Sequence, residues 1–243
     1  MSFRRTLILT GLSALAMLAA TAQATTPVHL YQLKDTSDVY GGPAIVGEGG
    51  SFNTALGGLT GYAFGVDQGL ILNNVVPANV YTLDFVVEFD TVGGYAKFVD
   101  FKDLTSDNGL YNLGARLNFY PVVSGPDAVL TSSQLVRVSL SRDATGLLKG
   151  YVNGTLQFSF DDSSAQLATF SSPLNVAHFF HDDTATGGRE ASGGFVDYIR
   201  VYDQALSDTE IAGLPDPALV PEPGTWALML AGSLAVLRRV RRG

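Results

Sequence analysis

The chain has 243 residues, with 15 Lys and Arg, 23 Asp and Glu, and no cysteine. The lack of cysteine excludes disulfides, thiolate metal sites and thiol chemistry. The formal net charge of −8 opposes binding to a phosphate backbone, so we expect no nucleic-acid partner.

The first 24 residues have the three parts of a secretory signal peptide. Arg4 and Arg5 form a basic start, an apolar run follows, and Ala22-Gln23-Ala24 supplies a cleavage site with small residues. This order predicts that the chain is exported and that the mature protein begins at Thr25.

Residues 25–219 are long enough for one domain with its own core. Six arginines and one glutamate lie outside this range, so it keeps 9 basic and 22 acidic side chains, a net charge of −13. A strongly acidic exported domain favours cations or neutral ligands such as sugars.

The central residues show the alternation of β-strands. In residues 80–89 one side of the pattern is apolar: Tyr81, Leu83, Phe85, Val87 and Phe89. This predicts a half-buried antiparallel strand, with a second strand over 95–101 after the glycines at 93 and 94.

Three further strands are predicted over 134–142, 147–152 and 155–160. Asn153-Gly154 separates the last two and predicts a tight hairpin, because both residues tolerate positive φ. In the final strand, Leu156, Phe158 and Phe160 are in phase, so they are expected to share one face.

Residues 174–180 and 195–202 add two strands, and residues 28–72 are expected to complete the fold. Ser207 and Glu210 have the spacing of a capping box at the start of a short helix, which Gly213 and Pro215 end. Many strands and one short helix predict an all-β protein, a two-sheet antiparallel sandwich over 25–219.

Two segments resemble the LamG-type domains of the concanavalin A-like lectin/glucanase superfamily. One is the hairpin of residues 137–155, and the other is the closing segment Gly194-Phe195-Val196-Asp197-Tyr198-Ile199-Arg200-Val201-Tyr202 with residues 203–211. The resemblance covers roughly residues 81–214. It implies a jelly-roll sandwich that binds polysaccharide or a surface partner.

The sequence predicts no catalytic residue. Glucanases of this superfamily carry Glu-x-Asp-x-x-Glu on one strand, but Glu88-Phe89-Asp90 lacks the second glutamate. His178 and His181 flank an aromatic pair and are interpreted as packed or capping residues, and His29 is the remaining histidine. We therefore expect a protein that is not an enzyme, with an exported glycan hydrolase or lyase as the alternative.

The loop of residues 181–194 is the candidate metal site. It is rich in glycine and carries Asp182, Asp183 and Glu190, and carboxylates on a flexible loop suit Ca²⁺. Some LamG domains bind Ca²⁺ at the rim of the sandwich. The alternative is a solvated acidic loop in which Asp182 or Asp183 caps a turn.

Sugar binding needs an aromatic platform. Tyr95, Tyr111, Tyr120 and Tyr151 are available, but the sequence does not say which of them avoid the core. No platform is assigned from the sequence.

Residues 220–243 resemble the PEP-CTERM sorting signal. The motif Pro221, Glu222 and Pro223 precedes a short apolar segment and a terminal arginine cluster at 238–242. The resemblance implies processing by an exosortase and anchoring of the precursor in the inner membrane by the apolar helix.

The sequence thus predicts an exported protein of the cell surface or extracellular matrix. Its sandwich domain is expected to bind polysaccharide or a surface protein, with Ca²⁺ as the candidate cofactor. A purely structural biofilm protein is the remaining alternative.

Overall fold

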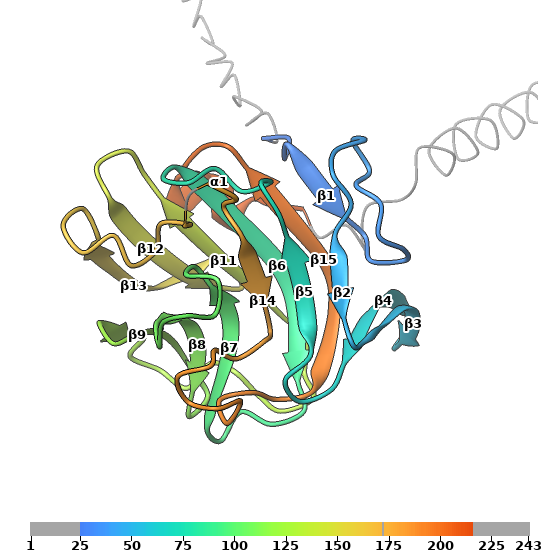
Figure 1. The fold of residues 1–243 in the computed structure, drawn as a ribbon. Helices are drawn as coiled ribbons and strands as arrows, with labels where there is room; N and C mark the ends of the chain where they lie inside the picture. Colours follow the sequence, from blue (N-terminus) through green and yellow to red (C-terminus); the bar gives the residue numbers. More distant parts are fainter. Residues whose placement is uncertain (1–24, 172, 216–243) are drawn as a thin grey trace, which may run out of the picture.

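A computed structural model describes residues 25–171 and 173–215. Within them the chain forms two antiparallel sheets packed face to face, with one short helix (Figure 1). The predicted all-β sandwich is confirmed. The signal peptide (1–24), the motif Pro221, Glu222 and Pro223 and the rest of the segment 220–243 lie outside the described residues.

The larger sheet, called sheet A, has eight strands in the order β13-β12-β11-β6-β15-β4-β3, with β1 also paired to β15. Its strands are β1 (His29–Tyr31), β3 (Ser51–Leu56), β4 (Leu59–Phe64), β6 (Tyr81–Phe89), β11 (Val136–Arg142), β12 (Leu147–Val152), β13 (Thr155–Asp161) and β15 (Gly194–Tyr202). The two longest strands, β6 and β15, are neighbours near its centre.

The second sheet, called sheet B, has seven strands in the order β10-β9-β8-β7-β14-β5-β2. They are β2 (Val46–Glu48), β5 (Gly69–Leu72), β7 (Tyr95–Asp100), β8 (Gly109–Leu113), β9 (Arg116–Tyr120), β10 (Val123–Ser124) and β14 (Ala177–Phe179). The helix α1 (Asp208–Ala212) follows β15.

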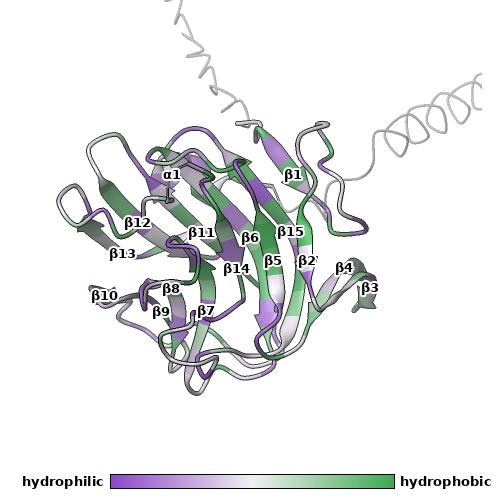
Figure 2. Ribbon diagram, in the orientation of Figure 1, coloured by the Kyte–Doolittle hydropathy of each residue, from purple (hydrophilic) through white to green (hydrophobic). Residues whose placement is uncertain are grey.

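The core lies between the sheets because alternate residues of each strand point inward. Phe85 and Phe89 of β6 contact Phe98 of β7, with ring centroids 6.0 and 4.7 Å apart. Apolar residues are concentrated along the strands and polar residues along the loops (Figure 2). The inward residues expected for β6 are all in this core.

The opposite face of β6 corrects one expectation. The strand is not half-buried, because its outward residues Thr82 and Asp84 are also fully buried. Asp84 accepts hydrogen bonds from Ser139 at 2.6 Å and Arg200 at 3.2 Å, and Arg137 donates to the carbonyl of Leu214 at 2.6 Å. The chain after β15 therefore closes the outer face of sheet A over a buried ion pair.

Two local motifs are confirmed. Asn153 and Gly154 have φ of 49° and 76° in the turn between β12 and β13. The capping box of α1 joins Ser207 to Glu210 in both directions. Leu156 is 43% exposed, next to a shift in register at Gly150/Tyr151.

Residues 25–215 contain both sheets, both hydrophobic clusters and α1. Every strand in the described residues pairs with another strand of the same range, so this segment supplies both sheets that enclose the core. In the part of the chain that the structure describes, no helix has the length and apolar character needed to cross a membrane.

Candidate functional site

A buried lysine lies on the outer face of sheet B. Its neighbours Ala96 and Phe98 face the core, so alternation along β7 turns Lys97 away from it. The side chain is nevertheless fully buried, because the loop after β14 folds over it. Two hydrogen bonds from Thr184 to the carbonyl of Leu104, of 3.1 and 3.0 Å, hold this loop in place.

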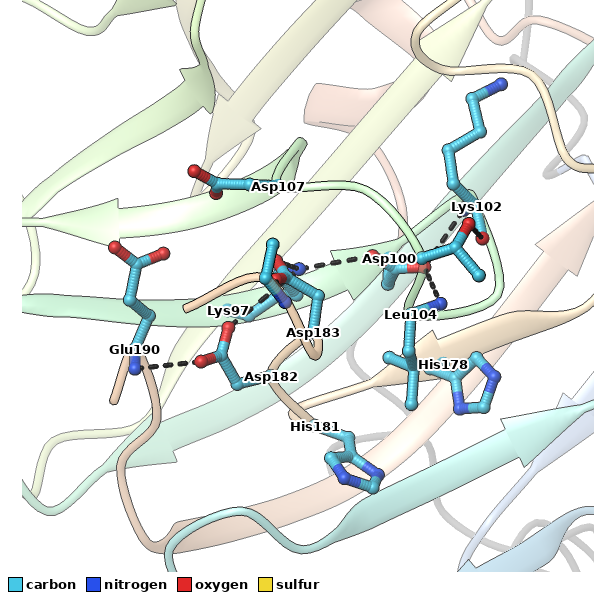
Figure 3. A network of polar contacts seen from close by, with 12 residues as sticks. Lys97, Asp100, Lys102, Leu104, Asp107, His178, His181, Asp182, Asp183 and Glu190 are labelled. Atoms are coloured by element: carbon cyan, nitrogen blue, oxygen red, sulfur yellow. Dashed lines mark hydrogen bonds and ion pairs between the residues drawn. The ribbon is translucent and has the colours of Figure 1, made fainter. Parts of the chain in front are cut away.

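Three aspartates gather around Lys97 (Figure 3). Its Nζ lies 2.5 Å from Asp183 Oδ2, 3.1 Å from Asp100 Oδ2 and 3.9 Å from Asp182 Oδ1. Burial alone would raise the pKa of Asp183, but its hydrogen bond and charge interaction with Lys97 hold it below the usual range. The lysine thus stabilises the ionised form of Asp183.

The carboxyl groups of Asp107 and Glu190 also lie beside this cluster. The acidic groups therefore outnumber the single ammonium group of Lys97. Burial and the carboxylates of Asp107 and Asp182 raise the pKa of Glu190 to about 7. Burial and Asp183 raise the pKa of Asp107. Asp182 Oδ1 is buried and has no hydrogen bond. The site therefore favours an added proton or cation.

Three tyrosines from neighbouring strands meet next to these carboxyl groups. The rings of Tyr95, Tyr111 and Tyr120 pack edge to face, with centroids 5.8 to 6.3 Å apart. Tyr111 is buried and donates to Asp183 Oδ2 at 3.2 Å, whereas Tyr95 and Tyr120 are half-buried. The cluster offers an aromatic surface beside acidic groups whose negative charge is not fully balanced by Lys97.

Tyr151 does not belong to this surface. Its hydroxyl group donates a hydrogen bond of 2.8 Å to Asp208 Oδ1 in α1, on the outer side of sheet A. Of the four tyrosines named from the sequence, three share one site.

The three sequence-predicted metal ligands lie on one loop, but their carboxylate oxygens do not form a group of described residues close enough to share an ion. The backbone N–H of Glu190 donates to Asp182 Oδ2 at 3.0 Å, and Asp183 is on the adjacent position of the same loop. The amide groups of Ala185 and Thr186 also donate to Asp183 Oδ1, as in a capped turn. Lys97 was missed by the sequence analysis, and Ca²⁺ at this loop stays a prediction.

The other acidic pair from the sequence lies elsewhere. Glu88 is partly buried on the outer face of sheet A, and Asp90 is exposed just after β6. Burial and Asp90 raise the pKa of Glu88. These two residues therefore do not share a site with the tyrosines on sheet B.

Two of the three histidines, His178 and His181, lie side by side, with ring centroids 6.2 Å apart. His178 and His181 lie on the outer face of sheet B next to Glu48, and their nitrogens face carboxylate oxygens. No sequence pattern links Glu48 to the histidines, because they lie 130 and 133 residues apart.

No family model and no curated protein matches the chain. Solved structures do match it. Domain 4 of AbnA, a GH43 extracellular arabinanase from Geobacillus stearothermophilus in complex with arabinotriose, is 17% identical, with a TM-score of 0.52, over 80% of this chain and 100% of that one. The botulinum neurotoxin serotype D binding domain is 14% identical, with a TM-score of 0.55, over 76% of this chain.

The Trypanosoma rangeli sialidase, solved with 2,3-difluorosialic acid, is 15% identical, with a TM-score of 0.58, over 78% of this chain. The chain spans 49% of the neurotoxin structure and 33% of the sialidase. At these identities the likeness shows the β-sandwich fold alone.

Proposed function

We propose that this protein is a glycan-binding domain whose sugar site is the outer face of sheet B. The observation that carries the proposal is the pair of half-buried tyrosines, Tyr95 and Tyr120, beside Asp107 and Glu190. Aromatic rings offer apolar surface to a sugar ring, and carboxylates accept hydrogen bonds from its hydroxyl groups. The arabinanase domain, solved with arabinotriose, and the sialidase lend support from similar folds.

Calcium is part of this proposal. Asp183 is held by Lys97 at 2.5 Å, so the oxygens offered to a cation would be those of Asp107 and Glu190, with the Oδ1 atom of Asp182, which lies 3.9 Å from Lys97 Nζ, as a third. The buried Asp182 Oδ1, which lacks a hydrogen bond, fits such a ligand. Hard oxygen donors and excess negative charge suit Ca²⁺.

The setting of the domain is proposed from the two ends of the sequence. A signal peptide at 1–24 and a PEP-CTERM-like segment at 220–243 favour export, exosortase processing at Pro221, Glu222 and Pro223, and a precursor held in the inner membrane. The mature domain is then placed at the cell surface or in the extracellular matrix, where polysaccharide is the partner.

A second candidate is a glycan hydrolase on the same face. It is favoured by Glu190, whose pKa of about 7 would let it donate a proton near neutrality. Glycosidases need a second carboxyl group in a set position, and Asp107 is the neighbour that the site offers. Shortening of a bound polysaccharide, lost in Glu190→Gln, would favour this candidate over binding alone.

The test is a glycan array probed with residues 25–215, once in EGTA and once in about 1 mM Ca²⁺. We expect binding to a subset of glycans that falls at least about tenfold in Tyr95→Ala and Tyr120→Ala. The control is Tyr40→Ala, because Tyr40 is 51% exposed and outside the cluster.

A flat array would overturn the proposal and favour a purely structural protein. Binding that survives both tyrosine substitutions would move the sugar site to another face. Binding that is equal in EGTA and Ca²⁺ would remove calcium from the proposal but keep the sugar site.

A further inference from the structure

Two histidines are brought to one face by an unusual backbone conformation. In a regular strand, residues three apart point to opposite faces. Phe180, just after β14, has φ of 67°, which reverses the alternation. Phe179 and Phe180 then both face the core, and His178 and His181 both face outward. A left-handed conformation at a bulky residue is strained and often marks a functional site.

A glycine permits the close packing of this segment. A Cβ atom at Gly69 of β5 would collide with the carbonyl oxygen of Phe179 and lie 3.1 Å from the backbone nitrogen of His181. Gly69 also pairs with Glu48 in the neighbouring β2. The missing side chain therefore lets His181 approach Glu48.

The ring nitrogens of both histidines converge on one carboxylate oxygen. Glu48 Oε2 lies 2.7 Å from His181 Nδ1 and 3.5 Å from His178 Nδ1. The opposite nitrogens face further carboxylates: His178 Nε2 is 2.9 Å from Asp103 Oδ1, and His181 Nε2 is 3.4 Å from Asp67 Oδ1.

This arrangement leaves hydrogen bonds unmade when the rings are neutral. A neutral imidazole has one N–H and one lone pair, whereas an ionised carboxylate only accepts. Four ring nitrogens face carboxylate oxygens, but two neutral rings carry two hydrogens. If Asp67 and Asp103 accept those hydrogens, both Nδ1 lone pairs point toward Glu48 Oε2, and a cation between them would resolve the repulsion.

We propose that Glu48, His178 and His181 bind a divalent transition-metal ion of the zinc class. Two imidazole nitrogens and one carboxylate oxygen form a typical ligand set for such an ion, whereas Ca²⁺ takes oxygen ligands. Asp67 and Asp103 act as supporting partners that fix the ring orientation, the usual role of carboxylates behind metal-bound histidines. This site is separate from the acidic loop proposed for Ca²⁺.

The spacing and exposure suit the ion. All three ligand groups offer atoms within 4.8 Å of one another. Tetrahedral zinc with bonds of about 2.0–2.1 Å needs ligand atoms about 3.3 Å apart, so small side-chain shifts complete the site. The Glu48 side chain is 28% exposed and that of His181 22%, so an ion can enter from solvent and keep a water molecule as its fourth ligand.

The experiment is a calorimetric titration of the full chain, in a mild detergent, with Zn²⁺. We expect the chain to bind one Zn²⁺ ion. With Co²⁺ as a second probe, we expect the complex to absorb visible light intensely, as Co²⁺ does in a site with few ligands. Affinity should fall at least about 100-fold in His178→Ala, His181→Ala and Glu48→Gln, and about 10–100-fold in Asp103→Ala.

Each result has a control. His29→Gln should leave the affinity unchanged, because His29 is paired with Asp38 on the other sheet. Glu48→Gln keeps the shape of a partly exposed side chain, and circular dichroism checks that each variant is folded. A Zn²⁺ affinity weaker than about 1 mM, or one that survives both histidine substitutions, would overturn the proposal.

Discussion

Lys97→Met removes the ammonium group that lies among Asp100, Asp182 and Asp183. All four side chains are 0% exposed, so solvent cannot compensate for the loss. Removing one partner of a buried ion pair costs about 3–5 kcal/mol, because the remaining charge is left without a counter-ion. Methionine keeps the apolar stem, so the loss reports the charge rather than a cavity. Against a typical total of about 5–15 kcal/mol, this is a large share.

The assay is urea unfolding of residues 25–215 at neutral pH, followed by circular dichroism. Lys149→Met is the matched control, since Lys149 and Asp208 form an ion pair of 2.7 Å whose side chains are 29% and 58% exposed. An exposed pair contributes less than about 1 kcal/mol. A Lys97→Met variant that loses no more stability than this control would refute the argument.

The same comparison has a pH dependence. The lowered pKa of Asp183 contributes stability above its unfolded value of 3.8, and this contribution is lost as pH falls through the folded value. The difference in the free energy of unfolding between wild type and Lys97→Met should therefore shrink as pH falls through the lowered pKa of Asp183, because its carboxylate then takes up a proton and no longer pairs with the ammonium group.

Two further predictions concern single residues. The pKa of Glu190 is raised from 4.5 to about 7, so its contribution to stability is complete below pH 4.5 and is lost as pH rises through about 7. In EGTA, Glu190→Gln should therefore have the same free energy of unfolding as wild type near pH 4.5. Above pH 7 the variant should be about 1 kcal/mol more stable. Urea unfolding at both pH values checks this, and a less stable variant above pH 7 would contradict it. A Cβ atom at Gly61 would collide with the backbone carbonyl oxygen of Val196, so Gly61→Ala should cost about 2–3 kcal/mol. Gly93→Ala is the control, because nothing lies within 4 Å of a Cβ atom at this position. In thermal unfolding it should be neutral or stabilising by up to about 1 kcal/mol. Equal effects of the two substitutions would show that packing at Gly61 is not the cause.

The elements that could be predicted are those whose cause is local. Alternation in β6, the Asn153-Gly154 turn and the Ser207–Glu210 capping box each depend on residues within one segment. The strands between 28 and 72 gave a weak signal, because β1, β2 and β5 have only three or four residues each. A strand of that length has too few alternating positions to distinguish it from a loop.

Features that depend on partners distant in sequence could not be predicted. Lys97 alternates with apolar residues as any solvent-facing lysine does, and its burial comes from a loop whose Asp183 lies 86 residues away. Similarly, the outward face of β6 is covered by residues after β15, including the carbonyl of Leu214, which Arg137 contacts. Asp182, Asp183 and Glu190 could be grouped from the sequence because one short loop carries all three, and their role as metal ligands stays a prediction.

The two outer faces of the sandwich differ in how they are closed, and this difference argues for where binding occurs. On sheet A, Asp84 is paired with Arg200 and held by Ser139, and the chain after β15 accepts hydrogen bonds from Arg137. On sheet B, the covering loop supplies carboxylates to a single lysine, and Asp182 Oδ1 has no hydrogen bond. A face with excess negative charge and half-buried aromatic rings is stabilised by a ligand that supplies what it lacks, a cation or hydroxyl donors. For this reason we place the proposed sugar and Ca²⁺ sites on sheet B, the sheet that also carries the proposed zinc-class site.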